Sequence, residues 1–269
     1  DTIEALAWGS NLNWGFSKHP PFSAFAVEFF YIIFGNKDWA FYLLSQIFVV
    51  IAFFFVWKLS IEFLENKIYS LLSVLLLSGI YFYNFTTPEF NVNVSQLPFW
   101  ALSVYFFWRG LNNNKKTDWV FFGIFSALGF LSKYLFIYIL LALLIFFILN
   151  LKNYRSSIKN YILSILISII LLIPHFIWLF ENNFVTIFYG LTRSGISEFN
   201  IVNHIKNPIE FLIKQTILLI PFFLMVLTIL RKIKFKIEIK DRKILFLLSI
   251  NLIPILLVLL TSLLSGAKI

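Results

Sequence analysis

The sequence predicts an all-α protein that crosses a membrane several times. Of its 269 residues, 60% are hydrophobic, 20% are aromatic and 13% are charged, whereas soluble domains are about half apolar and a quarter charged. The apolar residues gather in stretches suited to crossing a bilayer core of about 30 Å as helices. This composition excludes a disordered chain, a collagenous repeat and a water-soluble enzyme. Because the chain has no cysteine, disulfides, zinc-thiolate sites and thiol nucleophiles are excluded as well.

About eight membrane-spanning helices are predicted along the chain. Aromatic residues flank the shorter ones, where interface anchors belong. The stretch 20–34 is apolar but short and starts with two prolines, so we interpret it as an interfacial or re-entrant helix. The predicted spans are 39–59, 68–84, 96–109, 119–132, 135–150, 161–180, 211–230 and 244–264.

The basic residues divide unevenly between the connections of these spans. If residues 1–38 lie outside, the inside connections carry 15 of the 22 basic residues and a net charge of +10, and the outside segments carry −1. This division follows the positive-inside rule, so the formal charge of +9 indicates membrane topology and nucleic acid is not needed as a partner. We therefore expect 1–38, 85–95, 181–210 and 265–269 to lie outside.

The first outside segment holds the densest group of ionisable residues. Asp1 and Glu4 share one face if a helix starts here, although acids at a helix start also complement its dipole. Lys18 and His19 follow an aromatic–glycine turn and precede two prolines that stiffen the chain. The segment thus places a carboxylate pair and a cationic pair at a membrane surface.

Other polar residues follow in the remaining outside segments. Asn91 and Asn93 are suited either to binding sugar hydroxyls or to capping the next helix. Lys133 lies between two apolar segments, where an ammonium needs an anion or must snorkel to the interface. The outside loop 181–210, which carries Arg193, is long enough to cover or shape a site.

These residues, taken in order, resemble the dolichyl-phosphate-mannose–protein mannosyltransferase superfamily, membrane glycosyltransferases of the GT-C architecture that include bacterial aminoarabinose transferases. The likeness covers the whole chain. The matching residues are Asp1, Trp8-Gly9, Trp14-Gly15, Lys18-His19-Pro20-Pro21, Phe34-Gly35, Trp39, Asn91, Asn93, Gly129 to Tyr134, Pro174 to Trp178 and Leu263 to Gly266.

The resemblance implies one transmembrane glycosyltransferase domain of the GT-C helical-bundle type over residues 1–269. Its outer loops would be 1–38, with interfacial helices, and 181–210. The family places a further span before the acidic motif, so we expect the chain to be a fragment that lacks this span and the C-terminal region. As a multi-pass protein it would belong to the bacterial inner (plasma) membrane, with its site facing the periplasm or exterior.

The resemblance also implies an inverting transfer of a sugar from a polyprenyl-phosphate donor to a protein, lipid A or glycan acceptor. Asp1 would be the catalytic base, with Glu4 as a second acid. No cofactor is implied, although Asp1 and Glu4 together can hold a divalent cation. The residues implied for the donor phosphate are Lys18, His19, Lys133 and Arg193, and those for the sugar or acceptor are Asn91, Asn93, Tyr134 and His175.

Two other functions are consistent with a helical membrane protein of this kind. A transporter or flippase of polyprenyl-linked sugars would share the outer polar pocket, but it would be expected to show broken helices in pairs or related halves, which the sequence lacks. A non-catalytic membrane scaffold or assembly partner would give no role to the clustered residues Asp1, Lys18, His19 and Lys133.

Overall fold

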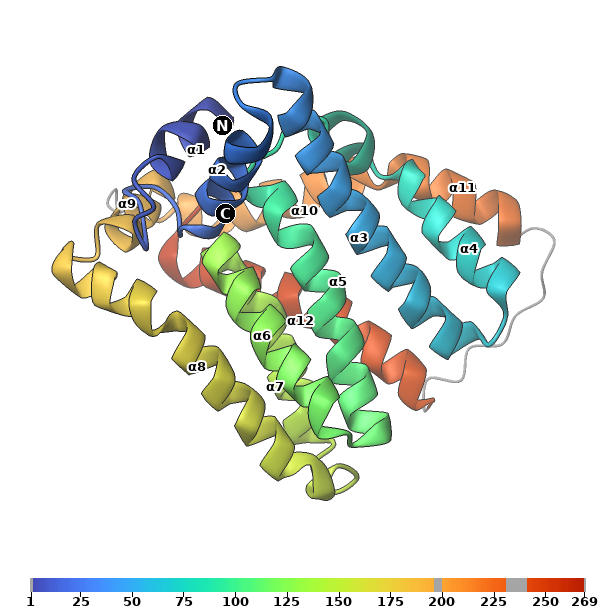
Figure 1. Ribbon diagram of the computed structural model, residues 1–269. Helices are drawn as coiled ribbons and strands as arrows, with labels where there is room; N and C mark the ends of the chain where they lie inside the picture. The colour runs from blue at the N-terminus through green and yellow to red at the C-terminus, as the bar shows by residue number, and fades with distance from the viewer. Residues whose placement is uncertain (1, 196–199, 231–240, 269) are drawn as a thin grey trace.

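The computed structural model describes residues 2–195, 200–230 and 241–268, and the described residues form helices and connecting turns without a strand (Figure 1). Asp1 lies outside them. Short 3₁₀ or π segments follow α4 and precede α7 and α8. The α-helices are α1 (Thr2–Gly9), α2 (Phe22–Phe34), α3 (Asp38–Leu64), α4 (Lys67–Leu75), α5 (Val92–Asn113), α6 (Lys116–Ser132), α7 (Ile137–Leu149), α8 (Ile158–Glu181), α9 (Val185–Arg193), α10 (Asn203–Leu218), α11 (Ile220–Leu230) and α12 (Arg242–Ser265).

The number of membrane-spanning helices is lower than the eight that the sequence suggests. In the described chain, three helices are long and apolar enough to cross a membrane: α3, α8 with its preceding turn, and α12. The consecutive helices α10 and α11 make a fourth if they form one span, bent by 44°. The other predicted spans are helical, but α7 has 13 residues, about 20 Å at 1.5 Å per residue, and α5 is less apolar. The apolar stretches therefore predicted helices correctly, but fewer of these helices are long and apolar enough to cross the bilayer than the eight predicted.

The core of the bundle lies where α5, α6, α7 and α12 meet. Large aromatic side chains fill it, among them Trp108, Trp119 and Phe246, each at most 1% exposed. Helix α6 approaches α8 closely at Gly123, where an added Cβ would lie 2.5 Å from the carbonyl oxygen of Ser164. A small residue at such a contact lets two helix backbones pack together, as is common between membrane helices.

The outer helices leave much of their apolar surface uncovered. On α3, α8 and α12 many large hydrophobic side chains are exposed, including Phe54, Leu166 and Leu256. A soluble protein rarely presents contiguous apolar surface of this extent. Together with the length of these helices, the exposure indicates that lipid surrounds the bundle.

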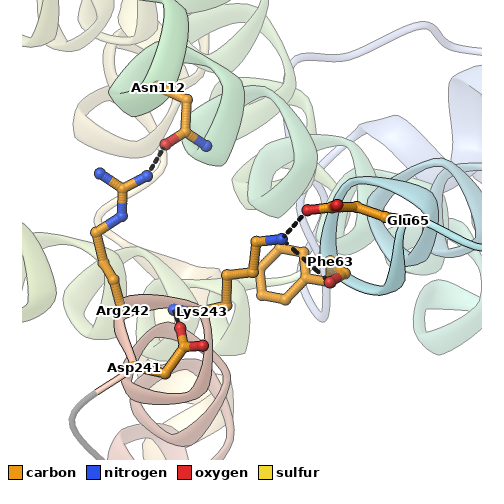
Figure 2. A network of polar contacts seen from close by, with 6 residues as sticks. All are labelled: Phe63, Glu65, Asn112, Asp241, Arg242 and Lys243. Atoms are coloured by element: carbon orange, nitrogen blue, oxygen red, sulfur yellow. Dashed lines mark hydrogen bonds and ion pairs between the residues drawn. The ribbon is translucent and has the colours of Figure 1, made fainter.

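Described residues at or beside three of the predicted inside connections meet at one end of the bundle. Lys243, at the start of α12, donates hydrogen bonds to Glu65 Oε1 at 2.9 Å and to the Phe63 carbonyl at 3.1 Å, both at the end of α3 (Figure 2). Its neighbour Arg242 donates to the side chain of Asn112 near the end of α5 (Figure 2). Segments that the charge division assigned to one side are thus neighbours in space, while α1, α2 and α9 lie at the opposite end (Figure 1).

We predict that this second end, with α1 and α9, faces the exterior. Because the chain has no cysteine, a single cysteine can be introduced at Asn200 or at Asn113. In intact cells an impermeant thiol reagent should label the cysteine at Asn200 and spare the one at Asn113, and both should react after lysis. Labelling confined to Asn113 would show that the orientation is reversed.

Candidate functional site

The loop between α1 and α2 is held to α1 by an ion pair. Glu4 lies in the first turn of α1, and Lys18 Nζ donates to its Oε1 at 2.5 Å. This hydrogen bond raises the pKa of Lys18 above its usual value. Glu4 and Lys18, which the sequence assigned to separate roles in the site, therefore form an ion pair with each other.

Lys133 lies at the end of α6, next to the start of α5. Its backbone leaves the helix in an extended conformation, and Nζ donates to Asn93 Oδ1 at 2.5 Å. Within the described part of the chain, no carboxylate forms an ion pair with Lys133. Burial, followed by repulsion from Arg193, lowers the pKa of Lys133. A desolvated ammonium with only a neutral partner is suited to bind an anion.

The two asparagines of the segment before α5 have different roles. Asn91 Oδ1 accepts hydrogen bonds from the backbone N–H groups of Asn93, at 2.8 Å, and Val94, at 3.2 Å. Asn91 is therefore the N-cap of α5, which is one of the two interpretations the sequence leaves open. The side chain of Asn93 instead contacts Lys133.

A buried histidine connects the first outer loop to the bundle. His175, on α8, is 0% exposed. Its Nδ1–H donates to the Trp14 carbonyl at 2.5 Å, so Nε2 is the acceptor for the Tyr134 hydroxyl at 2.9 Å. Both ring nitrogens of His175 are thus used within the protein. Tyr134 and His175 were predicted to bind the sugar or the acceptor. In the structure they connect α8 with the first outer loop at Trp14.

Further contacts hold the same loop in place. An added Cβ at Gly15 would lie 2.2 Å from the ring of Trp178 on α8, so only glycine fits this contact without a shift. The hydroxyl of Thr186, on α9, donates to the Phe16 carbonyl at 2.5 Å. The backbone before Lys18 is therefore fixed against α8 and α9.

Among the four basic residues predicted for the phosphate, His19 lies within electrostatic reach of Lys18, Lys133 and Arg193. Burial, and then repulsion from Lys133, lowers the pKa of His19 to about 4. Arg193 contributes to the repulsion felt by Lys18, His19 and Lys133. Three segments far apart in the sequence thus bring cationic or potentially cationic groups to one region, with His19 neutral near pH 7. We call these residues, Lys18, His19, Lys133 and Arg193, the basic cluster.

The predicted cation-binding acids are described only in part. Glu4 lines a small pocket with Trp8, His19 and Asn91, while Asp1 lies outside the described residues. Across residues 2–195, 200–230 and 241–268, no group of three or more His, Asp or Glu side chains is arranged to hold a metal ion. A divalent cation at Asp1 and Glu4 stays a prediction.

A second, larger pocket was not anticipated from the sequence. Its volume is about 390 Å³. Glu89, in the polar segment before α5, and Asp38, at the start of α3, were visible in the sequence as acids outside the bilayer, but nothing in their spacing joins them. The lining residues are Thr2, Ile3, Leu6, Asn36, Asp38, Phe41, Tyr42, Glu89 and Phe90.

The fold and this region define a class of protein: a helical membrane protein with a polar, basic site at one end of its bundle. A sequence model of the dolichyl-phosphate-mannose-protein mannosyltransferase family matches residues 18–178, more than half of the chain. The chain therefore belongs to this family and is a membrane glycosyltransferase of the GT-C type, like the mannosyltransferases. No curated protein and no solved structure matches the chain. The matched range includes Lys18, His19, Lys133 and His175.

We predict that His175→Phe destabilises the protein by about 2 kcal/mol, because it removes both hydrogen bonds of a fully buried side chain. Thermal unfolding of the full-length protein in detergent measures the loss. The matched control is Tyr138→Phe, which removes one half-buried bond to Thr261 and should cost less. Equal stability of His175→Phe and the wild type would contradict the link.

Proposed function

We propose that the protein transfers a sugar from a polyprenyl-phosphate donor to a hydroxyl of an acceptor, with inversion at the anomeric carbon. The observation that carries the proposal is the basic cluster. Lys18, Lys133 and Arg193 converge from three segments at one end of an apolar bundle. A lipid-linked phosphate suits this arrangement, because its tail stays in the bilayer and its charge meets the cations.

The reaction is a single displacement. The acceptor oxygen forms a bond to the anomeric carbon on the face opposite the phosphate, and the bond from that carbon to the phosphate oxygen breaks. The electron pair leaves with the polyprenyl phosphate, and the hydroxyl proton passes to a base, which we assign to Asp1. Cations near the leaving oxygen stabilise its growing charge.

The contacts suggest that the cations contribute unequally. Lys18 already pairs with Glu4, at 2.5 Å, so a phosphate must share or displace that partner. Lys133 donates to the neutral amide of Asn93 and keeps its charge available for an anion. We therefore assign the main phosphate contact to Lys133 and supporting contacts to Lys18, Arg193 and the neutral ring of His19.

The residues predicted for the sugar also divide. Asn93 lies beside Lys133, and we assign it to binding sugar hydroxyls next to the phosphate. Asn91 caps α5 and is one of the residues that line the small pocket with Glu4. We assign Tyr134 and His175 to positioning, because their hydrogen bonds join the loop before Lys18 to the chain that follows Lys133.

The test is turnover by the full-length protein in lipid vesicles, with a panel of polyprenyl-phosphate sugars and candidate protein, lipid and glycan acceptors. We expect a new glycoside and free polyprenyl phosphate in equal amounts from at least one donor, on the outer face of the bacterial inner membrane in cells. A transporter or flippase would instead move the intact donor between leaflets without cleaving it, and that result would overturn the proposal.

A further inference from the structure

We infer that the second pocket binds the acceptor and selects a sugar-sized group that carries no negative charge. The inference rests on the proposed function, since it names the acceptor class for the same reaction. Helix α1 separates the second pocket from the small pocket beside His19.

Opposite faces of α1 line the second pocket and the small pocket beside His19. A helix turns once in about 3.6 residues, so Thr2, Ile3 and Leu6 share one face, and these residues line the second pocket. Glu4, Ala5 and Trp8 share the opposite face, which borders the small pocket beside His19. One short helix therefore has the small pocket beside His19 on one side and the larger cavity on the other.

The start of α1 is anchored to the wall of the second pocket. The Thr2 hydroxyl donates to the Phe90 carbonyl at 2.9 Å, and its backbone N–H donates to Glu89 Oε1 at 3.4 Å. The cavity lies on the face of α1 that points away from His19. We therefore assign it to the acceptor, because the leaving phosphate requires the cations.

The charge of the second pocket is opposite to that of the basic cluster. Two of its lining residues, Asp38 and Glu89, are acids, and none of the nine is Lys, Arg or His. Like charges placed together at a binding surface disfavour binding. A phosphorylated or carboxylated acceptor group is therefore disfavoured here, and a neutral or cationic one is accepted.

The remaining lining suits a sugar ring. Phe41, Tyr42 and Phe90 supply aromatic surface beside the polar side chains of Asn36 and Asp38, and small-molecule sites commonly combine apolar walls with a few polar groups. A volume of about 390 Å³ lies near the lower end of the range of about 300–1,000 Å³ for such sites. The chemistry thus points to a neutral or amino sugar that presents a hydroxyl.

The experiment compares paired acceptors in the transfer assay. Methyl α-mannoside, methyl β-galactoside and the 6-phosphate of each are offered to the full-length protein with the donor that it cleaves. The wild type should use the neutral glycosides at least about tenfold better, as kcat/KM, than their phosphates. Asp38→Lys should raise the KM for the neutral acceptors and reduce this preference about tenfold, with the KM for the donor unchanged, and Asp38→Asn should lie between.

The control variant is Glu181→Lys, which makes the same charge change on an exposed acid at the end of α8, away from the pocket lining. It should keep the wild-type preference. An unchanged preference in Asp38→Lys and Asp38→Asn, or better use of the phosphates by the wild type, would overturn the acceptor pocket and leave the transferase proposal standing. Failure of every donor to be cleaved would count against the proposed function itself.

Discussion

Asp1→Asn in the full-length protein should reduce turnover at least about a hundredfold, within the range of 10²–10⁴ that a general base contributes. The amide keeps the size of the carboxylate and removes its capacity to accept a proton. Donor affinity and expression should stay near wild type, because the phosphate contacts are assigned to the basic cluster. Single-turnover kinetics with saturating donor measures the chemical step separately from binding.

The comparison variant is Glu4→Gln, which changes the other acid of the same segment. Glu4 accepts the hydrogen bond from Lys18, so we expect Glu4→Gln to alter the position of Lys18 and the KM for the donor more than the chemical step. Near-normal turnover in Asp1→Asn together with a hundredfold loss in Glu4→Gln would move the role of base to Glu4.

Lys133→Met should weaken binding of the polyprenyl-phosphate donor about 10- to 150-fold and slow its cleavage. The estimate corresponds to about 1.5–3 kcal/mol for a hydrogen bond to a charged group, with about 1.4 kcal/mol for each factor of ten. Methionine keeps the length of the side chain and its apolar contacts. The substitution also removes the hydrogen bond that Lys133 donates to Asn93. Donor affinity and thermal stability are measured on the same preparation.

Lys18→Met is the matched variant for the second lysine. Because Lys18 is neutralised by Glu4, its loss should reduce donor affinity less than the loss of Lys133. A lysine that only snorkels predicts a different result for Lys133→Met: unchanged donor affinity with equal or raised stability. That outcome would refute the phosphate contact.

Local features of the sequence determined the class of the protein. Apolar stretches with aromatic ends predicted helices in a membrane, and the helical structure with its exposed apolar faces confirms this. The order of short motifs indicated the family, which the match over residues 18–178 confirms. Segments that the division of basic residues assigned to one side also meet in the structure, since Glu65, Asn112 and Arg242 share one end of the bundle, while the orientation of that end stays a prediction. These properties depend on composition and order along the chain.

Only the tertiary structure decided how individual side chains are used. The sequence could not separate Asn91 as a cap from Asn93 as a partner of Lys133, because that choice depends on where α6 ends beside α5. Nor could it show that His175 is buried, with both nitrogens bonded to groups about 40 and 160 residues away along the chain. The second pocket joins residues of α1, α3 and the segment before α5. Such contacts arise when helices pack, and their energies depend on distances in space that spacing along the chain does not contain.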